Sequence, residues 1–298
     1  MAADALQTRS PGGGAGSNDM PVGEREFLFT DENFECVRRM LRDHAGIALS
    51  DAKRGMVYSR LARRLRALGL SSFADYCHLV SDGDGDEFTH FINALTTNLT
   101  AFFREAHHFE YLTGVLLPQL RQVHARDRRL RIWSAGCSIG EEPYSIAMAL
   151  REAMPDIEDW DVRILATDID SNVIETASRG IYALERVTNL EPERLRRWFR
   201  KGRGNNAGLV KVVDALRSLI SFRTLNLMHD WPMRGPFDVI FCRNVVIYFD
   251  KPTQRMLFER MAELLPIGGH LFIGHSESLF KVTDRFENLG RTIYRRIK

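Results

Sequence analysis

The feature that most constrains the fold is a change of hydrophobic pattern near residue 97. Before it, apolar residues recur at helical spacing, as in KRGMVYSRLARRLRALGL, where Val57, Leu61, Leu65 and Leu68 fall on one stripe. Further helices are predicted in FLFTDENFECVRRML, FADYCHLV and EFTHFINALTT. We therefore expect residues 24–96 to form a small all-helical domain.

After residue 97, short apolar runs alternate with helical stretches. The runs RLRIWSAG, DVRILATDID, LISFRTLNL, FDVIFCRNVVIYF and GGHLFIGH each suit a buried strand, and helices are predicted in PYSIAMALREAM and TQRMLFERMAELL. This alternation is typical of an α/β domain with a mainly parallel sheet covered on both faces. We expect the domain to span residues 97–298, with an insertion at about 180–221 around the loop GRGNNAG.

Composition argues against several classes of protein. The 298 residues include 41 Lys and Arg against 39 Asp and Glu, whereas proteins that bind nucleic acid through phosphates usually carry a larger basic excess. No apolar run approaches the roughly 18 residues that span a bilayer, and the N-terminus lacks the pattern of a secretory signal. Residues 1–23, which contain SPGGGAGSND, are predicted to be a disordered tail, and the protein is predicted to be cytoplasmic.

The four cysteines are scattered along the chain. Cys36, Cys77, Cys137 and Cys242 form no CxxC motif and have no close histidine pairing. This favours buried thiols in a reducing compartment over a zinc site, so we expect no metal.

The stretch WSAGCSIGEEPYS (133–145) follows the first predicted strand. Gly136 and Gly140 can let a ligand approach the carboxyl edge of the sheet, where α/β folds bind their ligands. The spacing GxxxG differs from the GxGxxG of dinucleotide sites, and carboxylates at Glu141 and Glu142 would repel a pyrophosphate. The loop therefore favours a cationic ligand without phosphate, such as S-adenosylmethionine. Glu141 by itself is also explained as a first-turn residue that complements the helix dipole.

Three other stretches carry candidate site residues. Asp168 ends a predicted strand and can accept hydrogen bonds from ribose hydroxyls, because Asp170 or Ser171 is the better cap for the next helix. Arg104, in TNLTAFFRE, suits recognition of a carboxylate, although a solvated charge explains it equally. Arg243, in CRNVVIYFD, closes a buried strand, where an unsatisfied charge is costly.

Together these four stretches resemble one family, the CheR-type protein-glutamate O-methyltransferases that act on chemotaxis receptors. TNLTAFFRE, SAGCSIGEEPYS, ATDID and FCRNVVIYFDK occur in family order, and the resemblance runs from about residue 27 onward. It implies a helical N-terminal domain that docks on the receptor and a class I S-adenosylmethionine-dependent methyltransferase domain of Rossmann-like fold with an inserted small β-subdomain. One departure is Ile139, where the family often has threonine.

The resemblance also implies roles for individual residues. Arg104 and Tyr248 are the residues nearest the transferred methyl and would orient the acceptor carboxylate. No general base is expected, because a glutamate is already ionised at neutral pH. The expected contacts to S-adenosylmethionine, or to its product S-adenosylhomocysteine, are Asn98, Thr100, Arg104, Gly136, Glu142, Asp168, Asn226, Leu227, Asn244 and Val245.

The implied partner is the cytoplasmic helical domain of methyl-accepting chemotaxis receptors. From Lys53 to Arg66 the chain has six positive residues and no negative ones, and Lys53, Arg60, Arg63 and Arg64 are predicted to dock on this acidic substrate. A solvated helix face is the alternative. In some family members the β-subdomain captures a receptor C-terminal peptide, and the strand in RKGRGNNAGLVKVV could accept such a segment.

Three rival functions remain at this point. Another S-adenosylmethionine enzyme would share fold and cofactor, but CRNVVIYFD lacks the Asn/Asp-Pro-Pro-aromatic stretch of enzymes that methylate nucleic-acid amino groups. A non-catalytic module that only binds the cofactor is disfavoured by Arg104 and Tyr248 occurring together. A nicotinamide dehydrogenase is disfavoured by the GxxxG spacing and Glu142.

Overall fold

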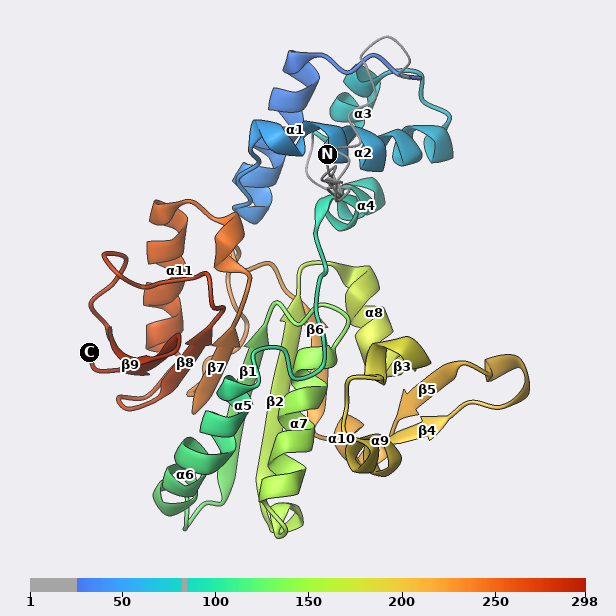
Figure 1. Ribbon diagram of the computed structural model, residues 1–298. Helices are drawn as coiled ribbons and strands as arrows, with labels where there is room; N and C mark the ends of the chain where they lie inside the picture. The colour runs from blue at the N-terminus through green and yellow to red at the C-terminus, as the bar shows by residue number, and fades with distance from the viewer. Residues whose placement is uncertain (1–25, 82–84) are drawn as a thin grey trace, which may run out of the picture.

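The computed structural model describes residues 26–81 and 85–298, so the tail predicted for residues 1–23 lies outside the described residues. The first domain is all-helical, as predicted (Figure 1), and its helices pack around an apolar core of their own. Its first helix begins after Thr30, which accepts the N–H of Asn33, and ends at Gly46 in a left-handed conformation. The helices are α1 (Asp31–Ala45), α2 (Arg54–Leu68), α3 (Phe73–Val80) and α4 (Asp86–Leu95).

The second domain is built on a seven-stranded sheet with the order β6-β2-β1-β7-β8-β10-β9. The first five strands of this order are parallel, and β10 pairs antiparallel with both β8 and β9. The strands are β1 (Arg129–Ala135), β2 (Asp161–Asp168), β6 (Ile220–Thr224), β7 (Val239–Cys242), β8 (His270–Ile273), β9 (Phe286–Gly290) and β10 (Ile293–Arg296). The mainly parallel sheet is therefore confirmed, whereas the C-terminal antiparallel hairpin was not predicted.

Helices cover both faces of the sheet, and neighbouring strand residues point to opposite layers. Ile132 packs in the core with α7 (Glu141–Ala153), while Trp133 packs in the core with α11 (Lys251–Glu263). The helical segment of residues 107–123, which the sequence pattern did not predict, lies on the α7 side. It consists of α5 (His107–Tyr111), a π-helical stretch (Leu112–Leu116) and α6 (Leu117–Val123), and α8 (Ser171–Arg179) follows β2.

The insertion forms a separate three-stranded antiparallel sheet in the order β3-β5-β4, which projects to the side of the main sheet (Figure 1). Because β5 is paired on both edges, an added peptide strand would have to pair with β3 or β4. The elements are β3 (Ile181–Ala183), α9 (Pro192–Trp198), β4 (Phe199–Lys201), β5 (Leu209–Val212) and α10 (Asp214–Arg217).

The two domains are joined by hydrogen bonds as well as by the chain. The backbone N–H of Ala48 donates to the carbonyl of Tyr248 at 2.8 Å, and the Asn226 side chain donates to the carbonyl of His44. An isolated antiparallel bridge pairs Ile47 with Phe249. Within the part of the chain that the structure describes, no helix is long and apolar enough to cross a membrane.

Candidate active site

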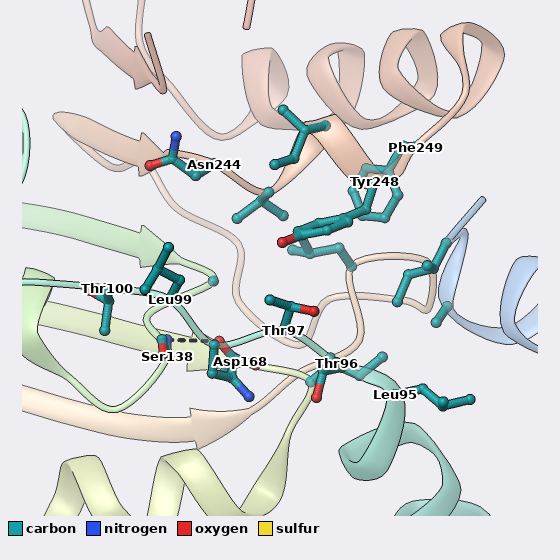
Figure 2. Close-up of a pocket in the computed structure, with 18 of the residues that line it drawn as sticks. Leu95, Thr96, Thr97, Leu99, Thr100, Ser138, Asp168, Asn244, Tyr248 and Phe249 are labelled. Atoms are coloured by element: carbon teal, nitrogen blue, oxygen red, sulfur yellow. Dashed lines mark hydrogen bonds between the residues drawn. The ribbon is translucent and has the colours of Figure 1, made fainter. Parts of the chain in front are cut away.

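A cavity lies where the strand order reverses. From β1 the chain moves to β2 and β6 on one side, and then returns to β7 on the other side of β1. Ligands of open α/β sheets bind at the carboxyl ends of the strands at such a switch point. The cavity there has a volume of about 450 Å³ and is lined by residues of both domains (Figure 2).

The cavity brings together every residue predicted to contact the cofactor, and Tyr248 and Lys53 also line it. The predicted cofactor contacts that line it are Asn98, Thr100, Arg104, Gly136, Glu142, Asp168, Asn226, Leu227, Asn244 and Val245. Their individual roles stay predictions, because no bound molecule is present.

The glycine of the β1 loop is required by close packing. Gly136 has a φ of 86°, and a Cβ placed there would lie 2.3 Å from Cγ2 of Val245. Any larger residue would be strained and would push against the loop that follows β7. Gly136 therefore allows the loops after β1 and β7 to meet at the cavity.

Glu142 is paired rather than free, and only 12% of its side chain is exposed. Its Oε1 accepts from the Ser134 hydroxyl at 2.7 Å, and its Oε2 accepts from Nη1 of Arg243 at 3.0 Å. Burial raises the pKa of Glu142, and the Arg243 guanidinium opposes that shift. The charge argument from the sequence was therefore too simple, since Arg243 offsets the negative charge that was expected to repel phosphate.

Glu141 belongs to a different contact. It is 1% exposed and pairs with Arg186, at 2.7 Å from Nε to Oε1 and 3.1 Å from Nη2 to Oε2. Arg186 also donates to the carbonyl of Thr100 at 3.2 Å. Glu141 thus ties the insertion to the start of α7 and to the cavity loop, which is more than a helix-start preference.

Asp168 ends β2 at the floor of the cavity. It accepts the N–H of Ser138 at 2.8 Å (Figure 2) and the N–H of Asp170 at 3.0 Å. Burial raises its pKa to about 6. Asp170, as expected, caps α8 and also accepts from Thr96 Oγ1 and Asn98 Nδ2, both at 2.9 Å. Asp168 therefore has acceptor capacity left for a ligand.

Arg104 and Tyr248 stand at the mouth of the cavity. Nη1 of Arg104 donates to the carbonyl of Leu99 at 2.8 Å, and its backbone neighbours Phe103 and Glu105 have φ values of 53° and 57°. Left-handed backbone at non-glycine residues is strained and concentrates at functional sites. Tyr248 ends a short 3₁₀ turn, and burial raises its pKa, so its phenol stays protonated at neutral pH.

Two buried charged residues, Arg243 and Glu277, hold the backbone beside the cavity mouth, and the sequence predicted the first only in part and the second not at all. Arg243 donates hydrogen bonds to Glu142 and to the carbonyl of Arg104, and its Nη2 lies 3.4 Å from Oε2 of Glu105. The sequence indicated that Arg243 needs partners but did not name them. Glu277 was missed. It accepts the N–H groups of Gly274 at 2.6 Å, Asn244 at 2.9 Å and Ile247 at 3.2 Å, and its signal is a carboxylate just after a buried strand.

The four residues predicted to dock on a substrate are not equivalent. Lys53 and Arg63 are exposed. Arg60 donates to the carbonyls of Ala94 at 3.2 Å and Thr96 at 2.6 Å. Arg64 donates two parallel hydrogen bonds to the Glu87 carboxylate, from Nε and from Nη2. Arg60 and Arg64 thus have internal partners, and the docking prediction is carried best by Lys53 and Arg63.

One cluster in residues 26–81 and 85–298 has metal-ligand character, formed by Glu105, His107 and His108. His108 is fully buried, and its Nε2 lies 3.1 Å from the carbonyl oxygen of Arg291. Burial lowers the pKa of His108 to about 4. The Arg243 guanidinium beside Glu105 would oppose a metal cation. We therefore assign no metal to this cluster.

Comparison with known proteins supports this architecture. The model of the CheR methyltransferase all-alpha domain matches residues 32–96, and that of the CheR methyltransferase SAM-binding domain matches residues 98–295. Chemotaxis protein methyltransferase 2 of Pseudomonas aeruginosa is 49% identical, covering 93% of this chain and 98% of the relative. The chemotaxis protein methyltransferase of Escherichia coli is 44% identical, with the same coverage of both chains.

Proposed function

Because this chain belongs to the CheR methyltransferase family, we propose that it forms glutamate methyl esters on the cytoplasmic helical domain of chemotaxis receptors. The enzyme is an S-adenosylmethionine-dependent chemotaxis protein methyltransferase. The proposal includes no nucleic acid and no membrane insertion, and it places the reaction in the cytoplasm. A receptor C-terminal peptide that pairs with an edge of the small sheet is a further part of it.

The residues of the cavity fit S-adenosylmethionine. Asp168 offers a buried carboxylate at the strand end, suited to ribose hydroxyls, and Gly136 lets the loops after β1 and β7 meet at the cavity that would hold the ligand. Glu142 keeps one lone pair on each oxygen for an amino group, because each accepts one hydrogen bond within the protein.

The observation that carries the proposal is the meeting of Arg104 and Tyr248 at the mouth of this cavity. The cofactor supplies a methyl group on a sulfonium. The acceptor glutamate needs no base, so the protein must hold its carboxylate in line and exclude water. The guanidinium of Arg104 and the protonated phenol of Tyr248 can each donate a hydrogen bond to that carboxylate, which orients it.

The test is transfer of radiolabelled methyl from the cofactor to receptor-containing membranes as a base-labile ester. Tyr248→Phe is expected to lower turnover roughly a hundredfold, because orientation of the nucleophile is lost. Cofactor affinity should be retained, which calorimetry measures. Full turnover in both Tyr248→Phe and Arg104→Ala would refute the roles assigned here, and label in nucleic acid or in a small acid would favour a different substrate.

A further inference from the structure

Two large apolar side chains are exposed at the mouth of the cavity. Leu99 is 78% exposed and Ile247 is 50% exposed, and both belong to the lining of the cavity. Single exposed apolar residues are normal on protein surfaces. These two differ because they flank Arg104 and Tyr248, where an exposed apolar side chain has no evident use in the protein alone.

The backbone that carries Leu99 is fixed. The carbonyl of Leu99 accepts a hydrogen bond from the Arg104 guanidinium at 2.8 Å. On either side of Leu99, the Asn98 side chain donates a hydrogen bond to Asp170, and the carbonyl of Thr100 accepts one from Arg186. Leu99 is therefore presented outward by a loop that is held on both sides.

Ile247 is held with similar rigidity. Its N–H donates to Glu277 at 3.2 Å, the preceding Val246 is buried, and the carbonyl of the following Tyr248 accepts from Ala48. In Figure 2 the Tyr248 hydroxyl points across the opening toward the loop that carries Leu99. The two apolar side chains thus stand on fixed backbone beside the groups that are assigned to the acceptor.

We propose that Leu99 and Ile247 form an apolar rim that packs against nonpolar side chains of the receptor helix on either side of the acceptor glutamate. This inference rests on the proposed function and names the contacts that select its substrate. In a helix, residues three or four positions from the glutamate lie on the same face, so they reach such a rim while the carboxylate enters the mouth.

The surroundings of the rim favour this occupant. The rim is continuous with the cavity in which the transfer takes place, and Lys53 lines the same cavity from the helical domain. An amphipathic helix with acidic and nonpolar positions on one face complements this combination. Packing on the rim also removes water from the acceptor carboxylate, which makes it a stronger nucleophile. The rim residues are substrate contacts, whereas Arg104 and Tyr248 remain the groups that orient the acceptor carboxylate.

The experiment uses the full chain with a purified cytoplasmic receptor fragment. Leu99→Asn and Ile247→Asn place polar groups on the rim, and Leu99→Met and Ile247→Leu keep it apolar. Val123→Asn is the matched control, because Val123 is 74% exposed at the end of α6 and does not line the cavity. Methyl transfer gives KM for the receptor, calorimetry gives Kd for the cofactor, and thermal melting gives Tm.

Each asparagine variant is expected to raise KM for the receptor roughly tenfold, the effect of losing the burial of about half a large apolar side chain. Cofactor Kd and Tm should not change, and the apolar variants and Val123→Asn should behave as the unsubstituted protein does. The increase should persist at high salt, because apolar contacts are not screened by ions.

Unchanged KM in Leu99→Asn and Ile247→Asn would overturn the proposal. So would a parallel loss of cofactor affinity or of Tm, since it would show that the side chains serve the cofactor site or the fold. A dimer of the unsubstituted protein that dissociates in the double asparagine variant would also overturn it, with a second copy as the occupant. Failure of the proposed function is distinct, because it would appear in the unsubstituted protein as an absence of base-labile label.

Discussion

Charged side chains gather in two regions, the cavity at the switch point of the sheet and helix α2, and the two regions use their charges differently. In the cavity, Arg243 is 2% exposed and pairs with Glu142, itself 12% exposed. On α2, Arg64 is also paired, whereas Arg63 extends into solvent. A charge at the end of a buried strand must find a partner inside the protein. A charged residue on a surface helix can form an ion pair within the protein or contact a binding partner, so the sequence alone does not indicate which of the two it does.

The largest effect is expected in the cavity, from Arg243→Met. Removal of one partner from a buried pair leaves Glu142 and Glu105 without their compensating charge, which typically lowers the free energy of unfolding by about 3–5 kcal/mol. Urea denaturation measures this loss. Arg63→Met is the control on α2 and should change stability by no more than about 0.5 kcal/mol. Equal effects of the two substitutions would remove the contrast between the regions.

The next effect concerns Asp168 and the binding of the cofactor. Asp168→Asn is expected to weaken affinity for S-adenosylmethionine roughly 10- to 100-fold, because hydrogen bonds to a charged acceptor are lost. Isothermal calorimetry measures the change, and Asp161→Asn, at the exposed start of β2, serves as the control. An affinity that is unchanged in Asp168→Asn would contradict the ribose contact.

The pH dependence of binding tests the same carboxylate. Burial raises the pKa of Asp168 to about 6 in the free protein, so the folded state holds its proton more tightly than the unfolded chain. The tighter proton binding by Asp168 stabilises the folded state. This stabilisation is fully present below the pKa that Asp168 has in the unfolded chain, and it is lost as pH rises through about 6. Hydrogen bonds from the ribose favour the ionised form, so affinity should rise with pH up to about 6 and then level off. Asp168→Asn should remove that slope.

A smaller effect is expected for the paired arginine of α2. Although burial acts in the opposite direction, hydrogen bonds from Arg64 and Tyr76 lower the pKa of Glu87. Arg64→Met should lower the free energy of unfolding by about 1 kcal/mol, as for a partly exposed pair. Thermal denaturation of Arg64→Met and Arg63→Met side by side measures the difference, and a larger loss in Arg63→Met would reverse our assignment.

The smallest effect is expected for the exposed cations. The double variant Lys53→Glu with Arg63→Glu should raise KM for the receptor severalfold at low salt and less at high salt, because surface charges are screened. Cofactor affinity in Arg63→Glu alone is the control and should stay constant, because Arg63 does not line the cavity. Insensitivity of KM to this charge reversal at low salt would leave α2 as a solvated helix face.

The sequence predicted the position of the site better than its internal contacts. Asp168 and Arg243 could be placed because strand ends meet at one edge of a parallel sheet, and the structure puts both at the cavity. The partners of Arg243 could not be found, since Glu105 and Glu142 lie far from it in the sequence and only the packed fold brings them together.

The missed elements have similar physical reasons. β9 is the edge strand and has only Phe286 buried, and β10 has only Ile293 and Tyr294 buried, so the hydrophobic signal of both strands is weak. The helix of residues 107–123 contains Gly114 and Pro118, which ordinarily indicate a break. Here the Thr113 hydroxyl bonds back to the carbonyl of Phe109, within a π-helical segment that continues to Leu116.

The hydrogen bond from Ala48 to the carbonyl of Tyr248 has a consequence for protein engineering. The helical domain supplies part of the support for Tyr248, which we propose orients the acceptor, so the boundary near residue 97 is not a clean place to exchange domains between relatives. A chimera that takes its helical domain from elsewhere must keep the segment 44–50 matched to the loop that carries Tyr248. With the proposed roles, receptor docking and the alignment of Tyr248 are therefore inherited together through the contacts of this segment.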